Sequence, residues 1–138
     1  MSLHQGRRLS ALALWLFVGL VAALPPGRAG ADPGPRVTEN LYDAAALPGG
    51  PLWRVGAFGL ISRSKDSGRT WQTLPSRTTE TLFAVDFADE NRGWAVGRGG
   101  LILATTDGGD TWTAQDSGTK NHLFDVDAVG PKEAWALG

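Results

Sequence analysis

Two eight-residue stretches decide the fold: SKDSGRTW at residues 64–71 and TTDGGDTW at residues 105–112. Both fit the pattern S/T-x-D-x-G-x-T-W, the Asp box. This pattern is typical of a turn between two strands, because a carboxylate accepts hydrogen bonds from turn N–H groups and a glycine can take a positive φ. The tryptophan that follows brings a large apolar surface into a thin sheet. We assign structural roles to Ser64, Asp66, Gly68, Thr70 and Trp71 in the first copy and to Thr105, Asp107, Gly109, Thr111 and Trp112 in the second.

The two motifs belong to a longer repeat with a period of 41 residues. The same offset relates three other sets of positions: Trp53, Trp94 and Trp135; Gly56, Gly97 and Gly138; Leu41, Leu82 and Leu123. An aromatic residue follows each of those leucines: Tyr42, Phe83 and Phe124. A period near 40 is compatible with helical arrays and with four-stranded propeller blades, so the content of the repeat has to decide between them.

The second copy divides at Gly, Asp and Asn clusters into four short segments: LFAVDF, GWAVGR, LILATT and WTAQ. Each has the length of a strand, and none is long enough for a helix. The middle segments are almost continuously apolar, as expected of a sheet covered on both faces. The sequence therefore predicts an all-β fold, a β-propeller of four-stranded antiparallel blades.

We expect about two and a half blades within residues 41–138. The predicted blades cover residues 41–81, 82–122 and 123–138, with the third incomplete, after an N-terminal segment at 32–40. A closed propeller has roughly four to eight blades, so the chain is expected to be an open fragment of a larger propeller, either a truncated product or a partial sequence.

Residues 1–31 have the three parts of a secretory signal peptide. Arg7 and Arg8 form the positive region, residues 10–24 are uncharged and apolar, and Ala29-Gly30-Ala31 offers a cleavage site before Asp32. The apolar run is shorter than the roughly 20 residues of a spanning helix. We therefore expect an exported protein, periplasmic or extracellular, that does not span the membrane once the signal is removed.

Charge and residue content exclude several functions. Without residues 1–31 the chain keeps ten basic and 14 acidic side chains, a net charge of −4, which disfavours nucleic acid as a partner. It contains no cysteine, and its histidines are only His4 and His122. A thiolate site, a cysteine nucleophile and a histidine metal cluster are thus excluded. We predict no catalytic residue, no metal and no cofactor.

The segments GWAVG (residues 93–97), GGLI (99–102) and TDGGDTW (106–112) resemble the photosystem II stability/assembly factor family. The resemblance covers residues 41–138. It implies a seven-bladed, non-enzymatic propeller on the lumenal or periplasmic face of a membrane, the thylakoid lumen in a photosynthetic organism. It also implies a protein partner, a subunit of a membrane complex, and an arginine patch that binds it. The candidates are Arg54, Arg92 and Arg98, from a wider set that includes Arg63, Arg69 and Arg77; the competing interpretation is ordinary solubilising surface.

The alternative is a sialidase-like Asp-box glycosidase fragment or a carbohydrate-binding propeller. Such enzymes resemble one another in an Arg-Ile-Pro segment, which this chain lacks. Asp66 and Asp107 are expected to face their own turns and not a substrate. Tyr42 alternates with phenylalanine in the repeat, and we expect it in the core, together with Trp53, Trp71, Trp94, Trp112 and Trp135.

Overall fold

The computed structural model describes residues 40–138, and all of its regular structure apart from two short 3-10 turns is β-strand. The prediction of an all-β fold built from four-stranded antiparallel sheets is confirmed. The first sheet contains β1 (Leu41–Ala46), β2 (Leu52–Gly56), β3 (Ile61–Ser64) and β4 (Gln72–Leu74). The second contains β5 (Leu82–Phe87), β6 (Gly93–Gly97), β7 (Ile102–Thr105) and β8 (Thr113–Gln115). The third pairs β9 (Asp125–Gly130) with β10 (Glu133–Leu137).

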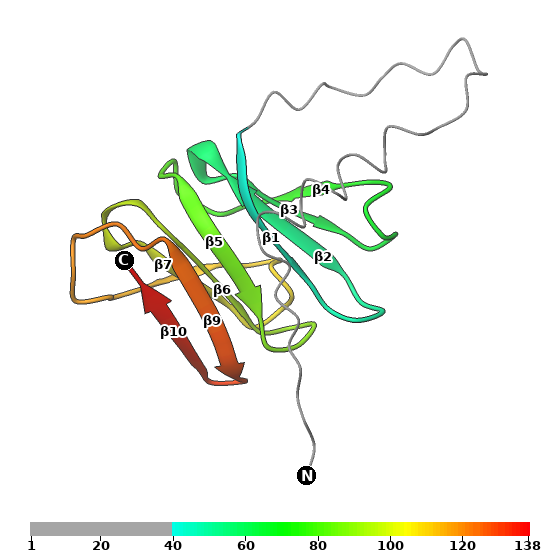
Figure 1. Ribbon diagram of the computed structural model, residues 1–138. Helices are drawn as coiled ribbons and strands as arrows, with labels where there is room; N and C mark the ends of the chain where they lie inside the picture. Colours follow the sequence, from blue (N-terminus) through cyan, green and yellow to red (C-terminus); the bar gives the residue numbers. More distant parts are fainter. Residues whose placement is uncertain (1–39) are drawn as a thin grey trace.

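We call the sheets blades 1, 2 and 3. Each full blade is an antiparallel meander in sequence order, and its first strand lies beside the first strand of the next blade. Figure 1 shows β1, β5 and β9 side by side, with the later strands of each sheet fanning away from them. This arrangement, innermost strands together and blades radiating, is that of a propeller sector.

The glycine that ends the second strand is required in every copy by close backbone contact. A Cβ on Gly56, Gly97 or Gly138 would lie 2.3, 2.1 or 2.0 Å from the carbonyl oxygen of Asn40, Thr81 or His122, respectively. In blades 1 and 2 this glycine leads into a short 3-10 turn, η1 (Ala57–Gly59) or η2 (Arg98–Gly100). A side chain at this position would collide with the backbone of the segment that leads into the first strand of the same blade, which explains why glycine recurs every 41 residues.

The main core lies between blades 1 and 2. Trp53 of β2 stacks on Phe87 of β5 with ring centroids 3.6 Å apart, and Trp112 meets Phe87 edge-on at 6.0 Å. A second, smaller cluster joins blades 2 and 3 through Ala84, Val96, Leu123 and Val126. The free energy that holds the blades together thus comes mainly from apolar area buried between sheets.

The prediction that all five repeat tryptophans are core is wrong for one of them. Trp53 and Trp112 are buried and Trp71 and Trp94 half-buried, but Trp135 is 62% exposed. The second-strand tryptophan of a blade is covered by the next blade along the chain, as Trp53 is by blade 2. Trp135 of β10 has no further blade against it within residues 40–138.

Some sequence predictions fall outside the described part of the chain. The signal peptide at residues 1–31 and nearly all of the 32–40 segment precede residue 40. Within residues 40–138 there is no helix with the length and hydropathy needed to cross a bilayer.

Candidate interaction surfaces

The first Asp box is a closed network of hydrogen bonds within one turn. The Ser64 hydroxyl donates to Asp66 Oδ1 (2.8 Å) and accepts from the Gly68 N–H (2.8 Å). Thr70 donates twice to Asp66, from its N–H to Oδ1 (2.8 Å) and from its hydroxyl to Oδ2 (2.5 Å). Both carboxylate oxygens of Asp66 are therefore occupied by the residues that the motif specifies.

The second Asp box repeats this network in blade 2. Thr105 takes the place of the serine, donating to Asp107 Oδ1 (2.8 Å) and accepting from the Gly109 N–H (2.9 Å). Thr111 donates to Asp107 from its N–H (2.9 Å) and its hydroxyl (2.6 Å). Two turns 41 residues apart thus have the same geometry, since the side chains themselves dictate it.

These hydrogen bonds stabilise the ionised carboxylates. The pKa of Asp66 is lowered to about 2, chiefly by the Thr70 hydroxyl and then by the Thr70 N–H. The Thr111 hydroxyl and N–H lower the pKa of Asp107 in the same way. A general acid at neutral pH needs a raised pKa, so neither carboxylate has the electrostatics of a glycosidase acid.

The second Asp box also joins the two blades. The Gly108 carbonyl oxygen accepts from Trp53 Nε1 (3.0 Å) and from Arg63 Nη1 (2.9 Å), both in blade 1. Arg63 Nη2 lies 2.8 Å from Asp110 Oδ1, and the Arg63 side chain is buried. Arg63, one of the wider set of surface arginines in the sequence analysis, therefore bonds to the next blade.

A second link between blades was not anticipated from the sequence. Asp43 Oδ2 accepts from the Val85 N–H (3.0 Å), and Asp86 Oδ2 accepts from the Ala128 N–H (2.8 Å), each on the innermost strand of the following blade. Burial raises the pKa of Asp43 to about 6, with smaller contributions from the charges of Asp125 and Asp86. The two carboxylates thus accept hydrogen bonds from N–H groups of β5 and β9. These are edge strands, so on that side their N–H groups have no neighbouring strand to pair with.

The three candidate partner-binding arginines lie in different places. Arg54 is in the middle of β2, with its guanidinium 4.2 Å from the ring centroid of Trp71. Arg92 ends the β5–β6 turn, which contacts the second Asp box through the hydrogen bond from the Gly108 N–H to the Asn91 carbonyl oxygen. Arg98 begins η2 at the opposite end of the blade and is exposed, 3.9 Å from Glu80. The structure does not bring these three side chains into one patch.

The two ends of the blades differ in character. Pairing of Leu41 with Gly56 and of Leu52 with Ser64 places the Asp boxes at one end and η1 and η2 at the other. At the η end lies a row of rings: Tyr42 meets Phe83 at 5.6 Å, and Phe83 meets Phe124 at 5.2 Å. Phe58, at the tip of η1, is 84% exposed. We call Tyr42, Phe58, Phe83 and Phe124 the aromatic rim.

The expectation that Tyr42 is a core residue is therefore wrong. Tyr42 is 43% exposed and Phe124 58% exposed. The strand pairing shifts register between Leu41 and Asp43, and the same shift occurs between Leu82 and Ala84 in blade 2. The ring at the intervening position therefore packs against the ring of the next blade instead of entering the core.

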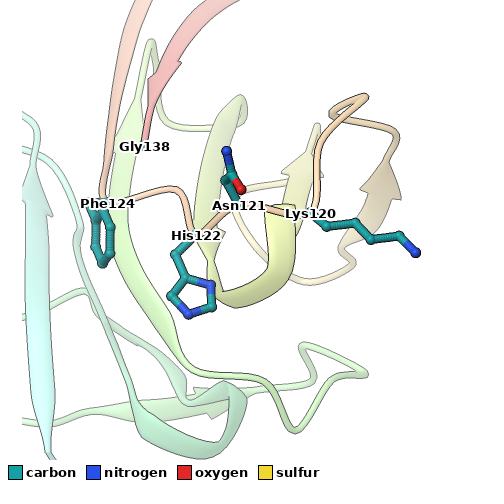
Figure 2. Close-up of a pocket in the computed structure, with 5 residues that line it drawn as sticks. All are labelled: Lys120, Asn121, His122, Phe124 and Gly138. Atoms are coloured by element: carbon teal, nitrogen blue, oxygen red, sulfur yellow. The ribbon is translucent and has the colours of Figure 1, made fainter.

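A hollow of about 310 Å³ opens beside blade 3 and is lined by Lys120, Asn121, His122, Phe124 and Gly138. Figure 2 shows the Lys120 side chain extending away from the His122 ring. His122 Nδ1 accepts from the Gly99 N–H at 3.1 Å. The hollow adjoins Gly138, which is equivalent to Gly56 and Gly97, the residues that precede η1 and η2 in blades 1 and 2. The polar side chains that line the hollow do not point towards one common position (Figure 2).

Within residues 40–138 no group of three or more His, Cys, Asp or Glu side chains has an arrangement that could hold a metal ion. The hydrogen-bonded carboxylates described above are satisfied by backbone and hydroxyl groups. What the geometry offers is surface for contact.

Comparisons with known proteins agree on one group. Two solved structures share the fold, one described as YCF48 bound to D1 peptide (24% identity, TM-score 0.62) and one as YCF48 from Cyanidioschyzon merolae (18% identity, TM-score 0.62). Each alignment covers 83% of this chain and 40% of the other, so the chain spans about 40% of the length of these structures. No curated protein sequence matches. A family model described as Photosynthesis system II assembly factor YCF48 matches residues 69–138, half of the chain. The chain belongs to the Photosynthesis system II assembly factor YCF48 family.

Proposed function

We propose that this chain acts as a non-catalytic, exported propeller scaffold that binds a protein subunit during assembly of a membrane complex, photosystem II in a photosynthetic organism. The observation that carries the proposal is the family match over residues 69–138, which includes the second Asp box and the start of blade 3. The related structure bound to a D1 peptide supports a peptide segment of the complex as the ligand.

The chemistry of the Asp boxes supports a scaffold over a glycosidase. Asp66 and Asp107 are ionised, and their oxygens accept hydrogen bonds from Thr70 and Thr111. Most glycosidases, other than the sialidases with their tyrosine nucleophile, need one protonated and one ionised carboxyl flanking the scissile bond. Tyr42 packs edge-on against Phe83, an environment suited to contact more than to nucleophilic attack.

Binding to D1 is tested with overlapping synthetic peptides that cover the D1 sequence, each labelled with fluorescein, in a polarisation assay with the full chain. We expect saturable binding of one segment, competed by the same unlabelled peptide. Absence of binding by every D1 peptide would contradict the proposed function. Turnover of a fluorogenic sialoside above background, lost in Tyr42→Phe, would establish the glycosidase instead.

Export is a separate part of the proposal and rests on Arg7, Arg8 and the apolar run at residues 10–24. N-terminal sequencing of protein expressed with its own N-terminus should find Asp32 as the first residue of the periplasmic or lumenal material. Intact Met1 in the membrane fraction would refute cleavage.

A further inference from the structure

The junction between blades 2 and 3 contains a histidine that bonds to the preceding turn. His122 lies in the segment between β8 and β9, and its Nδ1 accepts a hydrogen bond from the Gly99 N–H of η2 at 3.1 Å. The equivalent residues in the earlier copies are Asn40 and Thr81, whose side chains do not titrate. At this position, therefore, only the third copy has a side chain that can change its charge near neutral pH.

The hydrogen bond requires neutral His122 with its proton on Nε2. Neutral imidazole has one acceptor nitrogen, whereas both nitrogens of the imidazolium ion are donors. Protonation of Nδ1 would therefore remove the acceptor and turn a second N–H towards Gly99. Histidine changes its charge between about pH 5 and 8, and His122 is exposed, so protons reach it without any movement of the blades.

Two rings of the aromatic rim flank the histidine. The ring centroid of His122 lies 6.2 Å from that of Phe83 and 6.0 Å from that of Phe124. An aromatic face attracts a cation at about 6 Å or less. These two rings can therefore hold the imidazolium once it has released Gly99.

The charged groups around His122 are of both signs. They come from the segments packed around it and are Lys120, Asp125, Arg98, Glu80 and the terminal carboxylate of Gly138. Asp43 and Asp86, on the inner strands, accept hydrogen bonds from Val85 and Ala128 instead. Within residues 40–138 no carboxylate forms an ion pair with His122. The hydrogen bond to η2, and not a charge partner, thus distinguishes the two protonation states.

Two backbone contacts limit what protonation can move. The Leu123 N–H donates to the Gly97 carbonyl oxygen at 3.0 Å, and a Cβ on Gly100 would lie 2.1 Å from the Thr119 carbonyl oxygen. Neither contact involves a titratable group, so blades 2 and 3 stay joined when the histidine is protonated. Gly99 lies between these contacts, with a φ of +69° and nothing within 4 Å of an added Cβ. The part that the histidine alone holds is therefore the tip of η2.

We propose that His122 is a pH-sensitive switch at the junction of blades 2 and 3. In its neutral form it holds the tip of η2 against the segment that leads into blade 3. In its protonated form it releases that tip and rests between Phe83 and Phe124. The switch goes beyond the proposed scaffold function and does not depend on the identity of the ligand, because every contact in it lies within the chain.

NMR spectroscopy of the ¹⁵N-labelled full chain tests the switch, because one titration follows the imidazole nitrogens of His122 and the Gly99 amide together. At the alkaline end Nε2 should carry the proton and Nδ1 should be unprotonated. On acidification the Gly99 amide shift should change with the same midpoint as His122. The Gly99 exchange rate, corrected for its intrinsic pH dependence, should rise about fivefold, as expected for loss of one ordinary hydrogen bond.

His122→Asn is the matched control, because the asparagine Oδ1 can accept in place of Nδ1 but does not titrate, and blade 1 has asparagine at this position. Gly99 exchange in this variant should stay slow across the whole pH range. His122→Phe keeps a ring beside Phe83 but has no acceptor, so Gly99 exchange should be fast at every pH.

Three results would overturn the inference. The first is a proton on Nδ1 of neutral His122, since that nitrogen could not then accept from Gly99. The second is a Gly99 amide whose shift and corrected exchange rate do not change when His122 is protonated. The third is the same acid-dependent acceleration in His122→Asn, which would assign the effect to another group. The unchanged chain alone decides the first two, whether or not a variant folds.

Discussion

Arg63 links blade 1 to blade 2, and its replacement by methionine should weaken that link while keeping an unbranched apolar stem. The lost hydrogen bond from Arg63 Nη1 to the Gly108 carbonyl is 2.9 Å long and charge-assisted, a class that contributes about 1.5–3 kcal/mol. Arg63 Nε is buried without a hydrogen-bond partner among residues 40–138, which reduces the net gain. The ion pair with Asp110 adds little, because Asp110 is 60% exposed and exposed pairs contribute about 0–1 kcal/mol.

We therefore expect Arg63→Met to lower the free energy of unfolding by about 2 kcal/mol and Asp110→Asn to lower it by less than about 1 kcal/mol. For a domain of this size, 2 kcal/mol corresponds to a fall in melting temperature of roughly 8–16 °C. Urea unfolding followed by tryptophan fluorescence measures the free energy, and the double variant gives the coupling between the two side chains.

The coupling should be below about 1 kcal/mol, since the Gly108 carbonyl and not Asp110 is the main acceptor. If Arg63→Met unfolds at the same urea concentration as the unchanged chain, the hydrogen bond and ion pair of Arg63 with blade 2 contribute nothing to the free energy of unfolding. An Asp110→Asn effect equal to that of Arg63→Met, with a coupling of the same size, would show that the ion pair dominates and would refute the ranking.

Three further predictions concern the Asp boxes, the inner strands and the repeat glycines. Asp66→Ala should lower the melting temperature at pH 7, and the difference should shrink as the pH falls from about 4 towards 2, because the pKa of Asp66 is lowered from 3.8 to about 2 in the folded state. A constant difference down to pH 2 would contradict this. The pKa of Asp43 is about 6 in the folded state, so the unchanged chain should lose stability as the pH rises from about 4 to 6. Asp43→Asn should remove that loss, and an equal change of melting temperature with pH in the two proteins would refute the prediction. Gly97→Ala places a Cβ 2.1 Å from the Thr81 carbonyl oxygen and should lower the free energy of unfolding by about 3 kcal/mol or more. Gly99→Ala has nothing within 4 Å of its Cβ and should lower it by about 1 kcal/mol. Equal chemical-denaturation midpoints of the two variants would show that the close contact at residue 97 is relieved.

The strands and the turn motif could be predicted because they repeat. The segment LFAVDF is β5, and GWAVG is β6, since a strand between turn residues leaves the same apolar pattern in each copy. Trp53 and Trp94 also share a role, because each is covered by the following blade. Local sequence carries this information, so the 41-residue offset is enough to find it.

The links between blades could not be predicted in the same way. Arg63 and Asp43 correspond to Ala104 and Ala84 one repeat later, so these side chains are not repeated at the 41-residue offset. The contact of Asp43 has a counterpart in blade 2, but Asp86 makes it from another position of the repeat, so the offset gives no signal for it. The position of Tyr42 was missed for another reason. Tyr42 was expected in the core because phenylalanine occupies the same position in the other copies. The register shift after Leu41 interrupts the alternation of inward and outward side chains, so a shared aromatic position does not say on which side of the sheet the ring lies.

Hydrogen exchange of the full chain, with and without its best D1 peptide, tests the central claim most directly, because one measurement reports on peptide binding and on the Asp boxes together. We predict slower exchange on binding in a segment outside the Asp boxes and unchanged exchange in the Asp boxes at 64–71 and 105–112. Protection confined to the Asp boxes would contradict the account, since it would make the motif a binding site instead of a structural turn.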